Sequence, residues 1–110
     1  MSKTKPGIAV VEEIVGTGPI VDNHQRVHIL YDIQLNRGDF LARDERLTFR
    51  LNERGVIPGF RYGIEGMRVG GTRKFKASPH LCYAGKHVEN LPEHAVLVVT
   101  IKSLELAKEQ

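Results

Sequence analysis

The chain has very little cysteine, no tryptophan and no long apolar run. Its 110 residues include a single cysteine, Cys82, so no disulfide can form within the chain. No apolar stretch approaches the ~18 consecutive residues that a membrane-spanning helix needs. The opening segment, MSKTKPGIAV, also lacks the apolar core of a secretory signal peptide. We therefore expect a cytoplasmic protein that does not enter a membrane.

Several chemical signatures are missing as well. The sequence contains neither GxGxxG nor GxxxxGK[ST], so binding of nucleotides by those loops is not expected. The residues that could be imagined as metal ligands have irregular spacing: His80, Cys82, His87 and His94. Cys82 fits a small apolar residue better than a nucleophile paired with a histidine. We predict a site that works without a metal, a cofactor or proton transfer.

The positive charge is modest and dispersed. Sixteen Lys and Arg residues stand against 13 Asp and Glu residues, and the net charge is +3. The two signs alternate in RDERLTFRLNER (43–54). The densest basic group, formed by Arg68, Arg73, Lys74 and Lys76, has no accompanying aromatic platform for bases. This pattern favours a solvated strand face, and we expect no nucleic-acid partner.

What the chain does contain is typical of a small globular domain. Hydrophobic residues make up 41% and charged residues 26%, ordinary values for a soluble protein. A chain of this length has enough apolar surface for one modest core and too little for two. We predict a single domain over residues 1–110, in which residues 1–6 form a flexible tail, and a monomer.

Alternating apolar residues predict several strands. The clearest is RVHILYDIQL (26–35), followed by a turn at NRGD (36–39). One face carries Val27, Ile29, Tyr31, Ile33 and Leu35, and the other carries mostly polar residues that include Asp32. Further strands are predicted at GIAVVEEIVG (7–16), LTFRL (47–51), TRKFKA (72–77) and AVLVVTIKSLEL (95–106). Residues 78–94 are predicted to form a long loop.

One segment, GVIPGFRYGIEGM (55–67), indicates a short helix. Its apolar residues follow a 3.6-residue period at Ile57, Phe60, Ile64 and Met67. Pro58 suits the first helical turn. Gly59 and Gly63 are poor helix formers, and we expect them to allow close approach by a neighbouring group or a ligand. An antiparallel sheet with this helix as its only lid is the predicted arrangement.

Four sequence blocks in order resemble the FKBP-type peptidyl-prolyl cis–trans isomerases, the macrolide-binding immunophilins. These blocks are VIPGF (56–60), GIEGMRVGGTRKF (63–75), SPHLCYAG (78–85) and LPEHAVLVVTIKSLEL (91–106). The resemblance extends from about Gly7 to Leu106. It implies an α+β fold in which an antiparallel half-barrel sheet wraps around one short α-helix. An apolar pocket for a prolyl ring is implied between the helix and the sheet.

The resemblance also implies the site residues. Carried over by position, the catalytic residues are Tyr31, Phe40, Val56, Ile57, Phe60 and Tyr83, and the substrate-binding residues are Leu41, Leu47, Leu91 and Val99. The backbone N–H of Ile57 and the hydroxyl of Tyr83 are expected to hold substrate carbonyls. Periodicity alone would place Val56, Ile57, Phe60, Leu47 and Val99 in an ordinary core, and only the family pattern makes them pocket walls.

The chain also departs from the family pattern. Leu41 stands where an aspartate is usual, Asn90 replaces an aliphatic residue, and Glu93 replaces a second proline. The resemblance implies a peptidyl-prolyl cis–trans isomerase that acts in protein folding on proline-containing segments of client proteins. The departures predict reduced activity and reduced affinity for macrolide inhibitors. The alternative is a catalytically weak X–Pro-binding module on the same fold.

Overall fold

The computed structural model describes residues 7–22, 24–36, 38–53, 58–78 and 96–107. Within these ranges the chain forms five strands and one short helix. The elements are β1 (Ile8–Ile14), β2 (Arg26–Leu35), β3 (Phe40–Arg50), α1 (Pro58–Ile64), β4 (Thr72–Ala77) and β5 (Leu97–Leu106). No helix in these ranges is long and apolar enough to cross a membrane.

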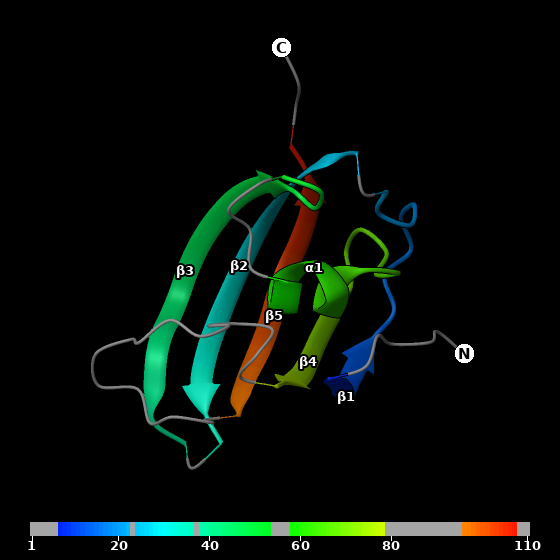
Figure 1. Cartoon of the computed structure of the whole chain (residues 1–110). Coiled ribbons are helices and arrows are strands. Elements are labelled where there is room, and N and C mark those ends of the chain that lie inside the picture. Colours follow the sequence, from blue (N-terminus) through cyan, green and yellow to red (C-terminus); the bar gives the residue numbers. More distant parts are fainter. Residues whose placement is uncertain (1–6, 23, 37, 54–57, 79–95, 108–110) are drawn as a thin grey trace.

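The strands form one antiparallel sheet in the order β1-β4-β5-β2-β3. Strands β1 and β3 are its two edges, so the sheet is not closed into a barrel. Helix α1 lies across one face of the curved sheet (Figure 1). The predicted α+β class and the half-barrel around a short helix are therefore confirmed.

Strand β2 has the bounds that its alternation predicts, because one of its faces supplies much of the core. Val27 and Ile29 are fully buried on that face, and Leu35 is 5% exposed. The opposite face contains one buried charge, Asp32. The carboxylate of Asp32 pairs with Nζ of Lys102 at 3.0 Å and accepts the backbone N–H of Asp44 at 2.8 Å.

Strand β3 is longer than LTFRL (47–51) predicts, since it begins at Phe40. Its first half pairs irregularly with β2, and the register shifts twice, between Tyr31 and Ile33 and between Ile33 and Gln34. Asp44 adopts a positive φ of 53° in this part of the strand. Such bulges break the two-residue alternation from which strands are recognised, so the sequence pattern did not reveal this half.

Helix α1 packs tightly against β4, and a glycine makes this contact possible. The helix begins at Pro58 as predicted, and Phe60 and Ile64 are buried. A Cβ atom on Gly63 would lie 2.1 Å from Cζ of the Phe75 ring. The close approach that the helical glycines predicted is therefore made, at Gly63, by a core side chain of the neighbouring strand.

Arg73 corrects the prediction of a solvated basic face on this segment. Its side chain is 1% exposed because it shares the inner face of β4 with Phe75. Nε and Nη2 donate to Oε2 of Glu13 at 3.0 and 2.6 Å. Nη1 donates to the carbonyl oxygens of Gly63 at 2.8 Å and Glu65 at 3.0 Å. Arg73 thus joins β1 to the end of α1, where helical carbonyls lack intrahelical donors.

Candidate functional site

Three aromatic rings from three elements meet between the sheet and the helix. The ring of Tyr31, on β2, meets the ring of Phe60, on α1, edge to face, with centroids 5.1 Å apart and planes at 73°. The ring of Phe49, on β3, lies 6.2 Å from the same Phe60 ring. Such edge-to-face pairs are a favoured aromatic geometry. Phe49 was not among the predicted site residues, although its alternation with Leu47 placed it on the inner face.

Two further predicted residues lie on this face of the sheet. Leu47 is opposite Ile29 in the register of β2 and β3, and its partly buried side chain packs against the core. Val99 is opposite Ile33 on one side and Phe75 on the other, and is 1% exposed. The structure therefore brings Tyr31, Phe60, Leu47 and Val99 together on the helix-facing side of the sheet.

Phe40 and Leu41 lie apart from that group. Phe40 is opposite Gln34 rather than a core residue, and the residue is 44% exposed, with the guanidinium carbon of Arg43 4.7 Å from the ring centroid. Leu41 is 43% exposed and is the additional residue of the bulge beside it. At this level of the strand, Ala42 packs against the core. The roles assigned to Phe40 and Leu41 thus rest on the family pattern.

The remaining predicted site residues lie outside the described residues. They are Val56, Ile57, Tyr83 and Leu91. The same holds for Cys82 and for the histidines considered as metal ligands. In the part of the chain that is described, no group of three or more His, Cys, Asp or Glu residues could hold a metal ion.

The hydroxyl of Tyr31 has an electrostatic neighbour that sequence reasoning missed. Glu45 lies directly opposite Tyr31 in the register of β2 and β3. Burial raises the pKa of the Tyr31 phenol, and the negative charge of Glu45 raises that pKa further. Tyr31 therefore stays neutral at physiological pH. The sequence pattern started this strand at Leu47, so Glu45 fell outside it, and only the strand pairing reveals the relationship.

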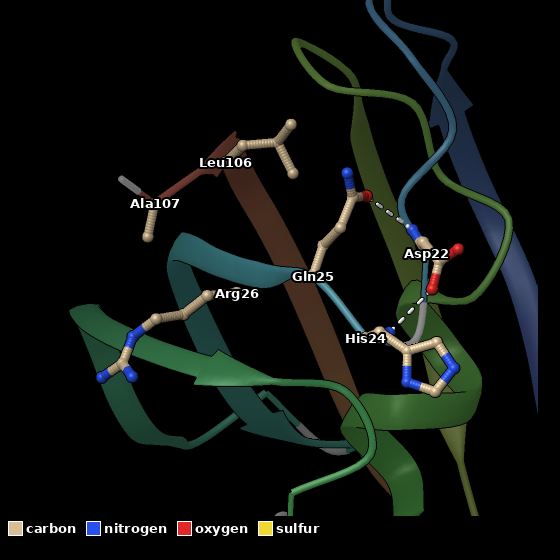
Figure 2. A pocket seen from close by; sticks show the side chains of 6 residues that line it. All are labelled: Asp22, His24, Gln25, Arg26, Leu106 and Ala107. Carbon is tan, nitrogen blue, oxygen red and sulfur yellow. Dashed lines mark hydrogen bonds between the residues drawn. The ribbon is translucent and has the colours of Figure 1, made fainter. Parts of the chain in front are cut away.

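A shallow pocket, separate from the aromatic residues described above, lies where β2 begins and β5 ends. Figure 2 shows this open hollow, lined by Asp22, His24, Gln25, Arg26, Leu106 and Ala107. Its polar groups bond to one another, since the backbone N–H of Asp22 donates to Oε1 of Gln25 at 2.9 Å and the N–H of His24 donates to Oδ1 of Asp22 at 2.8 Å. None of the predicted site residues lines it.

Comparison with known proteins gives this arrangement a family. The model of the family described as FKBP-type peptidyl-prolyl cis-trans isomerase matches residues 18–104. FK506-binding protein 4 of Chaetomium thermophilum is 32% identical over 94% of this chain, and the protein of the same name from Aspergillus fumigatus is also 32% identical over 94%. This chain spans only 22% of the length of each of these relatives.

Solved structures are similar in fold. The crystal structure of AtFKBP13 superposes with a TM-score of 0.80 at 28% identity, covering 94% of this chain and 96% of that one. FkpA from Escherichia coli superposes with a TM-score of 0.68 at 31% identity, covering 92% of this chain and 46% of that one. The family match spans most of the sheet and the helix that covers it. This chain therefore belongs to the FKBP-type peptidyl-prolyl cis–trans isomerase family.

Proposed function

We propose that this domain is a peptidyl-prolyl cis–trans isomerase that accelerates X–Pro isomerisation in protein folding. The observation that supports it best is the Tyr31–Phe60 ring contact on the helix-facing side of the sheet, in a chain of this family. The proposed site adds Leu47 and Val99 from the same face. The family pattern adds Phe40, Leu41, Val56, Ile57, Tyr83 and Leu91.

The chemistry suits an apolar, aromatic surface. Rotation about an X–Pro bond faces a barrier of ~20 kcal/mol because amide resonance must be broken. The twisted transition state has lost that resonance, so its C–N bond is less polar than in the planar amide. A site that excludes water favours the less dipolar form, and tighter binding of the twisted geometry accelerates the reaction. Neither a nucleophile nor a metal is needed.

Hydrogen bonds would hold the substrate on either side of the rotating bond. We propose that the backbone N–H of Ile57 and the hydroxyl of Tyr83 donate to substrate carbonyl oxygens. The entrance formed by Val56, Leu41 and Leu91 would favour an apolar residue before the proline. The natural substrates would be proline-containing segments of client proteins in the cytoplasm.

An isomerase assay tests the proposal. NMR exchange or a protease-coupled assay would measure the isomerisation of short X–Pro peptides, with and without a macrolide inhibitor. We expect acceleration over the uncatalysed rate at micromolar protein, unaffected by chelators or by Cys82→Ser. Loss of activity on chelation with recovery on adding metal would contradict the metal-free mechanism. Loss with Cys82→Ser would instead implicate the thiol.

A binding module is the second candidate. The observation that favours it is the position of Phe40 and Leu41, each more than two-fifths exposed and outside the aromatic group. Such a module would bind X–Pro segments without efficient catalysis. Saturable binding of X–Pro peptides in an NMR titration, together with no acceleration of isomerisation, would favour this function over the enzyme.

A further inference from the structure

Glu45 shares a face of the sheet with the aromatic residues Tyr31 and Phe49. From Glu45 to the end of β3 the two strands pair regularly, with Ile29 opposite Leu47, Leu30 opposite Arg46 and Tyr31 opposite Glu45, and the register shifts only beyond this last pair. Directly opposed residues of an antiparallel pair point to the same face, with Cβ atoms about 4.5–5.5 Å apart. The contact of the Tyr31 ring with Phe60 shows that this face is the one covered by α1. Glu45 therefore lies on the helix-facing side.

The carboxylate of Glu45 is accessible at the open edge of the sheet. Strand β3 is an edge strand (Figure 1), and the side chain of Glu45 is exposed. Within the described ranges, Glu45 forms no ion pair. It therefore presents a negative charge beside Tyr31 that a bound peptide could meet.

The charges nearest in sequence are directed elsewhere. Arg46 is opposite Leu30 and so lies on the other face. The guanidinium of Arg43 stacks over Phe40, and the carboxylate of Asp44 pairs with Nζ of Lys102. On the helix, Arg61 donates from Nη2 to the hydroxyl of Tyr62 at 3.1 Å. None of these described cations is paired with Glu45.

We propose that Glu45 determines charge specificity, selecting X–Pro segments that carry Lys or Arg next to the proline over those that carry Asp or Glu. This inference rests on the proposed function, because it concerns the substrate of the same site. The charge preference is additional to the proposed preference for an apolar residue before the proline. It would distinguish peptides that are identical except for one charged residue. The pKa of the Tyr31 phenol, raised mainly by burial, is raised further by the charge of Glu45, as their opposed positions in the strand pair lead us to expect.

The test compares matched peptides. Two series of X–Pro peptides would carry Lys, Leu or Glu either directly before or directly after the proline, and kcat/KM would be measured by NMR exchange. In at least one series we expect the Lys peptide to exceed the Glu peptide by about two- to fivefold, the range for one charge pair in water. Added salt should reduce this ratio.

Variants assign the preference to one carboxylate. Glu45→Gln should bring the Lys-to-Glu ratio close to one, and Glu45→Lys should invert it. Glu105→Gln is the matched control, because it removes the same charge from an exposed residue opposite His28 on the outer face. It should preserve the ratio. A merely structural role for Glu45 would lower all rates equally, whereas the proposed role changes the ratio between peptides.

An independent readout comes from Tyr31 itself. Glu45→Gln should lower the pKa of the Tyr31 phenol in an NMR titration, and Glu105→Gln should leave it unchanged. An unchanged pKa with Glu45→Gln would overturn the proximity on which the inference depends. Equal kcat/KM for the Lys and Glu peptides in both series, with normal catalysis of the Leu peptides, would overturn the charge specificity of Glu45. The proposed isomerase function would be unaffected by that result.

A different result would contradict the proposed isomerase function itself. No acceleration of the Leu peptides would contradict the isomerase, and charge preference would then be measured as the ratio of peptide dissociation constants in an NMR titration. A preference for Lys that Glu45→Gln removes would support the inference on a binding module. No preference, or no binding at all, would overturn it.

Discussion

Gly63 and Phe75 are in direct contact across the interface between α1 and β4. A Cβ atom at position 63 would lie 2.1 and 2.2 Å from two atoms of the Phe75 ring, distances that real Cβ contacts do not show. Phe75 is fully buried, so its ring has no free space into which it could move easily. The glycine therefore sets how closely the helix that carries Phe60 approaches the sheet.

We expect Gly63→Ala to destabilise the domain by about 1–3 kcal/mol, the usual cost of overpacking a core. We expect this net loss of stability even though alanine has a higher helix propensity than glycine, by ~1 kcal/mol. Urea denaturation would measure the loss. Combining Gly63→Ala with Phe75→Leu in a double-mutant cycle should show that the two costs are not additive. Additive costs would mean that another contact limits position 63.

Arg73→Met should cost about 1–3 kcal/mol of stability, the range for leaving buried hydrogen-bonding groups without a partner. The reason is that the change leaves the Glu13 carboxylate without its partner and removes the donor to two carbonyls at the end of α1. Lys76→Met, at an exposed position of the same strand, is the control and should have little effect. Similar denaturation midpoints for Arg73→Met and Lys76→Met would show that the Arg73 network contributes little.

Phe60→Ala and Tyr83→Phe should separate folding from binding. Phe60 is 6% exposed and touches both Tyr31 and Phe49, so its truncation should cost about 3–5 kcal/mol as well as catalysis. Tyr83→Phe removes one proposed hydrogen bond to substrate and should lower catalysis while the fold stays intact. Thermal unfolding and the isomerase assay would measure both. An equal loss of stability in the two variants would contradict the role proposed for Tyr83.

The pairing of Lys102 with Asp44 and Asp32 makes stability depend on pH at both extremes. The hydrogen bond from Lys102 and its charge lower the pKa of Asp44 below its ordinary 3.8. The hydrogen bonds to Asp44 and Asp32 raise the pKa of Lys102 above its ordinary 10.5. The Asp44 contribution is therefore present above its unfolded pKa and is lost as pH falls through the lower folded value. The Lys102 contribution is present below its unfolded pKa and is lost as pH rises through the higher folded value.

Lys102→Met should accordingly lower stability at neutral pH and make the decline toward acid shallower. Chemical denaturation at a series of pH values would measure both effects, with Lys76→Met as the control that keeps the wild-type profile. An unchanged acid limb in Lys102→Met would mean that the ion pairs do not persist in solution.

Leu41→Asp should tighten macrolide binding if Leu41 lines the site. The family pattern has a carboxylate at this position that accepts a hydrogen bond from the macrolide, and a buried hydroxyl left unpaired costs ~1–3 kcal/mol. We therefore expect wild-type affinity about one to two powers of ten below the family's usual range, at ~1.4 kcal/mol for each. Calorimetric titration of both forms is the measurement. Weaker binding by a folded Leu41→Asp variant would show that Leu41 does not occupy the assigned position.

Elements whose signals are local could be predicted from the amino-acid sequence. The alternation of Val27 through Leu35 predicted β2 at its observed bounds, and Pro58 marked the start of α1. Both follow from the chain's own geometry, since side chains alternate along a strand and proline fits the first turn of a helix. Four short blocks in order identified the family in the same way, because each is contiguous in the chain.

Features that depend on pairing between distant segments could not be predicted in this way and became visible only in the folded structure. The bulged first half of β3 shows no two-residue period, and its register with β2 is what places Glu45 opposite Tyr31. Arg73 belonged to an apparently solvated basic group until the contact between β4 and the end of α1 buried it beside Glu13. In each case the deciding partner is remote in sequence. The periodicity of apolar residues along the chain does not reveal that partner, because strand register and burial are set only when the sheet and helix pack together.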